Sequence, residues 1–219
     1  MIVNGISLWE SNGIRGRGEK APVIAGTRKG PAVVLGSARC IWDDMAKIDF
    51  SKVEVIAVND MIIHYKGELH HAVSLHPEEP PLWKQLRWTN GCASGGHIYT
   101  HSHRYPSHIK HPNGEFKAEH GLDFIWELEG GRGGSSGLFA CMIGLALGYD
   151  KIILAGIPLD GNGHFFDPPG KEVNQFLGQN ITWEWENAET NYFAGRVKSM
   201  SGRTMDLLGY PPEDWGVLK

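Results

Sequence analysis

Short, continuous runs of apolar residues recur along the chain, and each ends at a glycine or a polar residue. Three of them, "PAVVLG", "VEVIAVND" and "KIILAGI", are rich in β-branched residues, which is typical of strands buried on both faces of a parallel sheet. We expect residues 32–36, 53–59 and 152–157 to be neighbouring parallel strands at the centre of that sheet. Weaker runs predict two more strands, at residues 70–76 and 197–202.

Helical patterns alternate with these strands. Residues 37–48 carry apolar side chains at helical spacing, and residues 136–147 are almost entirely apolar and are followed by Gly148. Two further helices are predicted near residues 183–197 and 204–215. Strands that alternate with helices indicate an α/β fold, with a mainly parallel sheet and helices on both faces.

The length of 219 residues predicts a single domain over residues 31–219, preceded by an N-terminal arm at residues 1–30 that contains a short strand. Residues 77–121 read as an inserted loop region rich in Pro, Gly and His, which we expect to be mobile or to pack as a lid over the strand ends. Six of the eleven histidines fall there, and zinc ligation or a solvated loop are the alternatives. These histidines are His97, His101, His103, His108, His111 and His120.

Composition narrows the classes of partner. The net charge of −4 disfavours broad electrostatic binding to nucleic acid. The three cysteines form neither a disulfide framework nor a CxxC metal site, and Cys40 and Cys141 are expected in the core. The sequence shows no apolar stretch of the roughly 20 residues that a membrane span needs, and no signal-peptide pattern. We therefore expect a cytoplasmic protein.

A glycine- and serine-rich stretch, "GGRGGSSG", directly precedes the apolar helix predicted at residues 136–147. A helix N-terminus offers unpaired N–H groups and a partial positive charge, and a loop without bulky side chains lets an anion approach them. Ser135 and Ser136 add hydroxyl donors or a helix cap, and Gly137 adds access. This predicts a phosphate or nucleotide site, and the alternative is an ordinary capped core helix.

Ligands of parallel α/β sheets bind beyond the carboxyl ends of the strands, so the residues that follow each strand are further candidates. Gly36, Ser37 and Arg39 form a strand-to-helix turn of the type that binds phosphate, and Arg39 can donate to an anion. The turn is neither G-x-G-x-x-G nor a Walker A sequence, which disfavours NAD enzymes and P-loop kinases. Asn59 and Asp60 end the next strand. The alternative is an ordinary turn with a solvated arginine.

Two other pairs have plain structural interpretations. Asp43 and Asp44 resemble a metal-binding pair, but within a helix a solvated face is the simpler prediction. Trp183 and Trp185 alternate with glutamates, and packing in the core is favoured over stacking on a sugar or base.

The segment "SSGLFACMIGLALGYDKIILAGIPLD" resembles the corresponding segment of small bacterial sialyltransferases that use CMP-sialic acid. "VVLGSAR" and "VIAVND" stand where that family has two nucleotide-binding turns. The Rossmann-like core is similar, more loosely, to the archaeal pterin diphosphokinase group. The C-terminal segment "GRVKSMSGRTMDLLG" is similar to uncharacterised phage proteins. The resemblance to phage proteins would place the chain in a host cytoplasm. The resemblance covers about residues 31–76 and 133–206.

The resemblance implies that Gly36, Ser37, Asn59 and Ser135 to Gly137 contact a nucleotide. Two tyrosines that hold the leaving phosphate in the family match Asp160 and His164 here, and the catalytic histidine of the family has no counterpart, since no histidine follows His164. Independently of the resemblance, His164 lies in the turn "DGNGHFFDP" after the strand that ends at Ile157, and Asp160 is close to it in sequence. They are the candidate catalytic pair, with His164 as proton donor or base and Asp160 orienting it or sharing a metal with it. The alternative for His164 is an exposed loop residue.

These observations predict a nucleotide- or nucleotide-sugar-binding, glycosyltransferase-like enzyme with an unknown acceptor. One alternative is diphosphate or nucleotidyl transfer with Mg²⁺, for which Asp60 and Asp160 are the candidate ligands. Another is a non-catalytic nucleotide-binding protein of phage type. The sequence identifies no definite cofactor and leaves Mg²⁺ open as one, and it leaves a second copy of the chain open as a partner.

Overall fold

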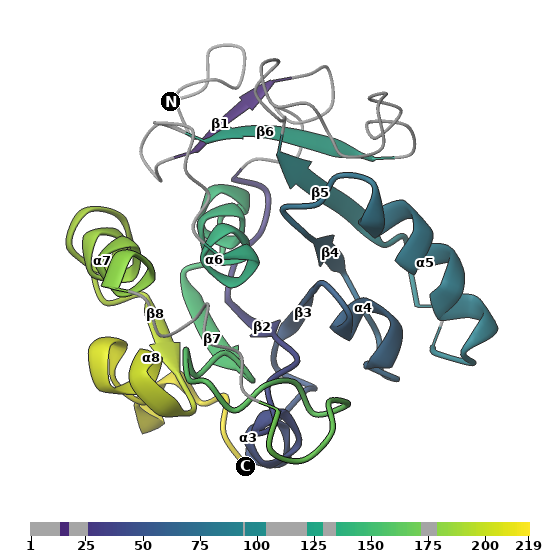
Figure 1. Ribbon diagram of the computed structural model, residues 1–219. Helices are drawn as coiled ribbons and strands as arrows, with labels where there is room; N and C mark the ends of the chain where they lie inside the picture. The colour runs from purple at the N-terminus through teal and green to yellow at the C-terminus, as the bar shows by residue number, and fades with distance from the viewer. Residues whose placement is uncertain (1–13, 18–25, 94, 104–121, 129–134, 172–178) are drawn as a thin grey trace.

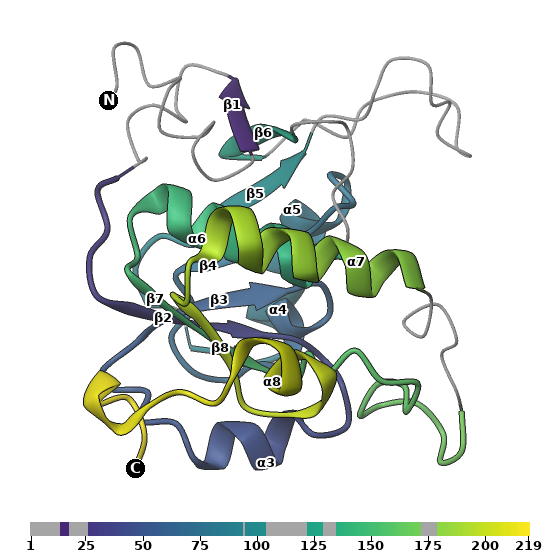
Figure 2. The ribbon, with the colours of Figure 1, turned by 90° about the vertical axis from the view of Figure 1, so that its left-hand side faces the viewer.

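The computed structural model describes residues 14–17, 26–93, 95–103, 122–128, 135–171 and 179–219. Within them, eight strands form one sheet in the order β1-β6-β5-β4-β3-β2-β7-β8 (Figures 1 and 2). All neighbouring strands are parallel except β1 and β6, which are antiparallel. The predicted α/β fold with a mainly parallel sheet is therefore confirmed. The strands are β1 Ile14–Arg17, β2 Pro31–Leu35, β3 Glu54–Val58, β4 His71–Val73, β5 Tyr99–His103, β6 Phe124–Leu128, β7 Lys151–Ala155 and β8 Val197–Ser199.

The three strongest apolar runs form the centre of the sheet, as predicted. Strand β2 pairs with β3 on one side and β7 on the other, with Val33 opposite both Val55 and Ile153. Successive residues of a strand point to opposite faces, so β2 contributes to two cores. Ala32 and Val34 belong to the core under one layer of helices, and Val33 and Leu35 belong to the core under the other layer.

Helices cover both faces of the sheet (Figure 1). One core contains residues of α6 (Ser136–Leu147), α7 (Gln179–Ala188), the π-helical segment Glu189–Phe193 and α8 (Gly202–Leu208). The other contains residues of α3 (Ile41–Ala46) and α4 (Met61–His64), together with a C-terminal segment that includes a short 3₁₀ turn, Glu213–Trp215. Trp185 is fully buried against Phe193 while Trp183 is 57% exposed, so the predicted core role holds for Trp185 and is wrong for Trp183.

Helix α6 has the bounds that the sequence predicted. All twelve of its residues are buried, which is why its apolar pattern runs around the whole helix. Ser135 caps it, its hydroxyl oxygen accepting a hydrogen bond from Leu138 N at 3.3 Å. Gly148 ends it at φ +109°, where a Cβ would lie 2.5 Å from Arg28 O, so glycine is needed there.

The region predicted as an inserted loop contains regular structure. Residues Glu79–Thr89 form α5, and Tyr99–His103 form β5, which is paired between β4 and β6. The prediction of a mobile segment or a lid is therefore wrong for these residues. The polar sequence of β5 is buried because its side chains bond inside the fold: Thr100 bonds to Asp123, and Ser102 donates to Ser74 O. The remainder, residues 104–121, lies outside the described residues.

No helix in the described part of the chain is long and apolar enough to cross a membrane. Cys141 is fully buried, as expected, and Cys40 is partly buried beside Ser201 Oγ. Burial is the main cause that raises the pKa of Cys40 to about 11, which keeps this thiol protonated at neutral pH.

Candidate functional site

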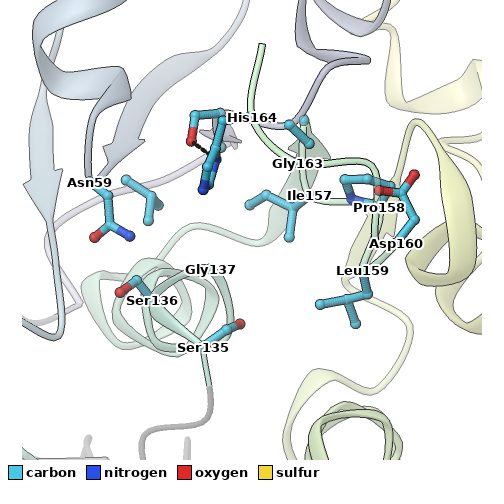
Figure 3. Close-up of a pocket in the computed structure, with 15 residues that line it drawn as sticks. Asn59, Ser135, Ser136, Gly137, Ile157, Pro158, Leu159, Asp160, Gly163 and His164 are labelled. Atoms are coloured by element: carbon cyan, nitrogen blue, oxygen red, sulfur yellow. Dashed lines mark hydrogen bonds between the residues drawn. The ribbon is translucent and has the colours of Figure 1, made fainter. Parts of the chain in front are cut away.

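A cavity of about 100 Å³ lies beyond the carboxyl ends of β2, β3 and β7, against the N-terminus of α6 (Figure 3). It is the place where ligands of parallel α/β sheets bind. At this cavity the structure brings together candidate residues that are far apart in the sequence, from Gly36 to His164. The lining residues are Gly36, Ser37, Ala38, Val58, Asn59, Ser135, Ser136, Gly137, Gly156, Ile157, Pro158, Leu159, Asp160, Gly163 and His164.

The first turn of α6 forms the floor of the cavity. Ser136 Oγ accepts a hydrogen bond from Leu75 N at 3.2 Å, which ties the start of the helix to the segment after β4. Ser135 Oγ accepts from Leu138 N. Both hydroxyls act here as acceptors, so each keeps its O–H proton for a ligand. In the described part of the chain, the N–H groups of Ser136 and Gly137 have no acceptor.

Two glycines let the chain pass close to Ile157. A Cβ at Gly36 would lie 2.4 Å from Ile157 Cγ1 and 2.6 Å from Gly156 O, which is closer than real Cβ atoms come. A Cβ at Gly137 would lie 3.0 Å from Ile157 Cδ1. From the sequence, Gly137 is expected to give a ligand access and Gly36 to belong to a phosphate-binding turn. The structure adds a packing role, because Ile157 fills the space beside both of them.

Asn59 lines the cavity in a left-handed backbone conformation, at φ +51°. Its side-chain oxygen accepts a hydrogen bond from Ser74 Oγ at 2.8 Å. Figure 3 shows the amide nitrogen on the side that faces the other labelled residues. Leu159, also in the lining, has φ +52°. Backbone strain of this kind costs about 1–3 kcal/mol and is concentrated at functional sites.

His164 points into the cavity from the loop after β7 (Figure 3). Its Nδ1 lies 2.8 Å from Ser37 Oγ, so its partner is Ser37 and not Asp160, which the sequence had suggested. The ring stacks on Phe166, with centroids 5.1 Å apart and planes 9° apart. Its main-chain N–H donates to Asp167 Oδ2 at 2.9 Å. These contacts fix the imidazole rather than leave it as an exposed loop residue.

Asp160 lines the cavity beside His164, and its two carboxylate oxygens accept hydrogen bonds from Asn162 N at 3.1 Å and Asn162 Nδ2 at 2.8 Å. It also lines an adjoining open groove that contains Cys40, Asp43 and Lys171. Asp160 therefore belongs to the linings of both the cavity and the groove.

Two of the predicted site residues lie elsewhere. Arg39 donates to three main-chain carbonyls, Asn162 O at 2.6 Å, Asp167 O at 3.0 Å and Pro168 O at 2.6 Å, and so holds the His164 loop instead of facing the cavity. Asp60 is the N-cap residue before α4 and does not line the cavity. Asp60 and Asp160 are therefore not brought together at this cavity.

The role of Asp44 was not predicted from the sequence pattern. It is 2% exposed, and its Oδ2 accepts hydrogen bonds from Gly156 N at 2.9 Å and Ser201 Oγ at 2.8 Å. The predicted solvated helix face is correct for Asp43, which is exposed, and wrong for Asp44. Asp44 supports the turn that carries Gly156 along the cavity wall.

The described residues contain no group of three or more His, Cys, Asp or Glu side chains placed to hold a metal ion. Of the His-rich segment, His101 is fully buried and bonds to His71 at 3.0 Å, and His97 lies 3.4 Å from Asp123. His103 is partly buried in β5. The other three predicted candidates, His108, His111 and His120, lie outside the described residues.

No family model and no curated protein matches the chain. Among solved structures, the chain is similar to the sialyltransferase CstII from Campylobacter jejuni in complex with a substrate analogue, cytidine-5'-monophosphate. The identity is 16%, over 84% of this chain and 85% of that chain, and the TM-score is 0.52. A mammalian sialyltransferase in complex with Gal-beta-1-3GalNAc-ortho-nitrophenol is 14% identical, over 90% and 77% of the two chains, with a TM-score of 0.46. The likeness to CstII shows that the chain has a sialyltransferase-like, Rossmann-like α/β fold.

Proposed function

We propose that the cavity binds the nucleotide of a nucleotide-sugar and that the chain is a glycosyltransferase-like enzyme. The observation that carries this proposal is the convergence of Asn59, His164 and the first turn of α6 on one cavity at the carboxyl ends of the central strands. Since CstII, which has the same fold, was solved with cytidine-5'-monophosphate, we take cytidine nucleotides as the first ligands to test.

In the proposed complex, the phosphate lies on the N-terminus of α6. The N–H groups of Ser136 and Gly137 and the hydroxyls of Ser135 and Ser136 donate to its oxygens, and the helix dipole adds to their effect. The cavity of about 100 Å³ receives the phosphate group, while the nucleoside and the sugar extend into the open space beside it.

The proposed reaction is a direct displacement at the anomeric carbon. The acceptor hydroxyl gives its proton to Asp160 as its oxygen bonds to the anomeric carbon. The bond from that carbon to the phosphate oxygen breaks, and its electron pair stays on the phosphate. His164 stabilises the developing charge on the leaving group. Asp160 suits the role of base because it also lines the groove from which an acceptor can reach the cavity.

Binding is tested first, by calorimetry and thermal shift with CMP, UMP, AMP and GMP. For a ligand at 100 times its dissociation constant, the stabilisation is about 2.7 kcal/mol, or roughly 5–10 °C in Tm for a chain of this size. Asn59→Ala should weaken binding, while Asp60→Asn, at the next position but outside the cavity, serves as the matched control. Equal effects of both variants would place the ligand elsewhere.

Turnover is tested second, by hydrolysis of CMP-N-acetylneuraminic acid and other nucleotide-sugars. Slow hydrolysis that is lost in Asp160→Asn and His164→Ala supports the transferase. Release of AMP or pyrophosphate that depends on Mg²⁺ supports the diphosphokinase alternative, and binding without turnover supports a nucleotide-binding protein. A chain that binds none of the four nucleotides would refute the proposed site.

A further inference from the structure

Two buried serines contact polar side chains of the cavity, Ser37 from within the lining and Ser74 from outside it. Ser74 Oγ lies 2.8 Å from Asn59 Oδ1, and Ser37 Oγ lies 2.8 Å from His164 Nδ1. Ser74 is 0% exposed and Ser37 is 7% exposed. Because each hydroxyl meets the atom of its partner that can accept a proton, the direction of the two hydrogen bonds decides what the cavity presents to a ligand.

For Asn59 the direction follows from the chemistry of the amide. Oδ1 can only accept, so the Ser74 hydroxyl donates its proton to it. Ser74 Oγ in turn accepts a hydrogen bond from His76 N at 3.0 Å, so the hydroxyl is used in both directions. The Asn59 amide is thereby held with its N–H₂ group on the cavity side (Figure 3). No acceptor for this group occurs in the described part of the chain.

For His164 the direction follows from the needs of the hydroxyl. Within the described residues, Nδ1 of His164 is the polar partner of Ser37 Oγ, marked by the dashed line at His164 in Figure 3. A nearly buried O–H that found no acceptor would carry a free-energy cost, and an imidazole nitrogen is a good acceptor. Ser37 therefore donates to Nδ1, and the neutral ring carries its own proton on Nε2, the nitrogen that faces the cavity.

The geometry points to Ser37 and Ser74 as positioning residues that turn His164 and Asn59 into fixed hydrogen-bond donors for the ligand of the cavity. The inference rests on the proposed function for the identity of that ligand, but not for the orientation of the two side chains. It makes His164 a donor to the leaving phosphate rather than a base, and it adds two N–H donors to those of the helix terminus. Such a set selects an anion.

The tautomer of His164 can be measured without any ligand, by long-range ¹H–¹⁵N correlation spectra of the histidine ring above pH 8. We expect the proton on Nε2 in the wild type. In Ser37→Ala we expect the ring nitrogens to shift toward a mixture of the two tautomers, and Ser37→Thr should restore the wild-type spectrum. Ser37→Cys, with a weaker donor, is the second variant if threonine does not fold. The ¹³Cγ resonance of Asn59 should move to lower ppm in Ser74→Ala, since a carbonyl carbon is deshielded by an accepted hydrogen bond.

The affinity for CMP gives the functional readout. Ser37→Ala and Ser74→Ala should each weaken CMP binding about threefold to tenfold, the effect of one misdirected hydrogen bond. Ser199→Ala is the matched control, because Ser199 is also buried and hydrogen-bonded but contacts neither Asn59 nor His164. A His164 proton on Nδ1 in the wild-type protein would overturn the inference. It would also be overturned if the His164 tautomer, the Asn59 chemical shift and the CMP affinity all stayed unchanged in both alanine variants. If CMP does not bind at all, the proposed ligand is wrong, and the spectra still decide the orientation of both side chains.

Discussion

Acid should destabilise this protein through two buried histidines that do not line the cavity. His71 and His101 are fully buried under α6, and their rings are hydrogen-bonded, His71 Nδ1 to His101 Nε2 at 3.0 Å. Trp126 Nε1 donates to His101 Nδ1 at 3.1 Å. His71 Nε2 lies 3.0 Å from the hydroxyl of Tyr149, which in turn donates to Glu54.

The direction of each hydrogen bond in this network follows from Trp126 at one end of it. An indole N–H can only donate, so His101 accepts at Nδ1 and donates from Nε2 to His71. His71 then donates from Nε2 to Tyr149. Both rings are satisfied in the neutral form, and a second proton on either would place two N–H groups face to face.

The pKa values follow from this arrangement. Burial is the main cause that lowers the pKa of His101 to about 3, with Asp123 raising it and Arg28 lowering it. Burial also holds the pKa of His71 well below its usual value, helped by His101, Arg28 and His70. A histidine in the unfolded chain has a pKa of about 6.5, so between that value and the lower folded pKa the unfolded state binds more protons. Stability is therefore full above pH 6.5 and falls as the pH drops below it.

For His101 the loss is about 2 kcal/mol at pH 5, out of the 5–15 kcal/mol that is typical of a folded protein, and His71 adds to the loss in the same direction. Urea unfolding at pH 7.5, 6.5, 5.5 and 5.0 measures it. His101→Asn should lower stability at every pH and also reduce the slope below pH 6 by about one proton, or 1.4 kcal/mol per pH unit. A wild-type free energy of unfolding that stays level from pH 7.5 to 5.0, or a variant with an unchanged slope, would refute this reasoning.

Two further substitutions test the wall of the cavity. Asp44→Asn should destabilise the fold by about 1–3 kcal/mol in urea unfolding, because it puts a neutral amide where a buried carboxylate accepts a hydrogen bond from Gly156 N. The control is Asp43→Asn, on the exposed side of the helix, which should change the free energy of unfolding by no more than about 0.5 kcal/mol. Gly137→Ala should cost about 1 kcal/mol because its Cβ meets Cδ1 and Cγ2 of Ile157. The cost should shrink by at least about 0.5 kcal/mol in the double variant with Ile157→Ala, which removes both atoms, and additive effects would show that this contact is not the cause.

Local patterns were enough to predict the centre of the fold. The runs that became β2, β3 and β7 are continuous and apolar, because a parallel strand is buried on both faces. Helix α6 could be bounded to the residue, since a serine cap and a glycine after the last turn flank an apolar run. These features depend on neighbours in the sequence, and so a sequence reveals them.

Strand β5 and the role of Asp44 could not be predicted in this way. Tyr99–His103 is polar, and it is buried because its partners come from other strands, as His101 bonds to His71 and Trp126. Asp44 is buried because Gly156, 112 positions away, donates to it. Likewise, the partner of His164 is Ser37, 127 positions away. In each case the local sequence is typical of a solvent-exposed residue, and the tertiary contact determines that the residue is buried or paired.

Residues with a strained backbone conformation are concentrated at the cavity. Among the described residues, three that are not glycine have positive φ, and two of them, Asn59 and Leu159, line this cavity. Asparagine tolerates the left-handed region, whereas a leucine there is strained. Leu159 is nonetheless 7% exposed and packed in the core under α6, so its side chain anchors the conformation that its backbone disfavours. An ordinary strand-to-loop turn would use glycine at such a position, as the chain does at Gly156. The leucine therefore holds the loop of Asp160 and His164 over the helix terminus, at a cost to stability that the packing of its side chain offsets.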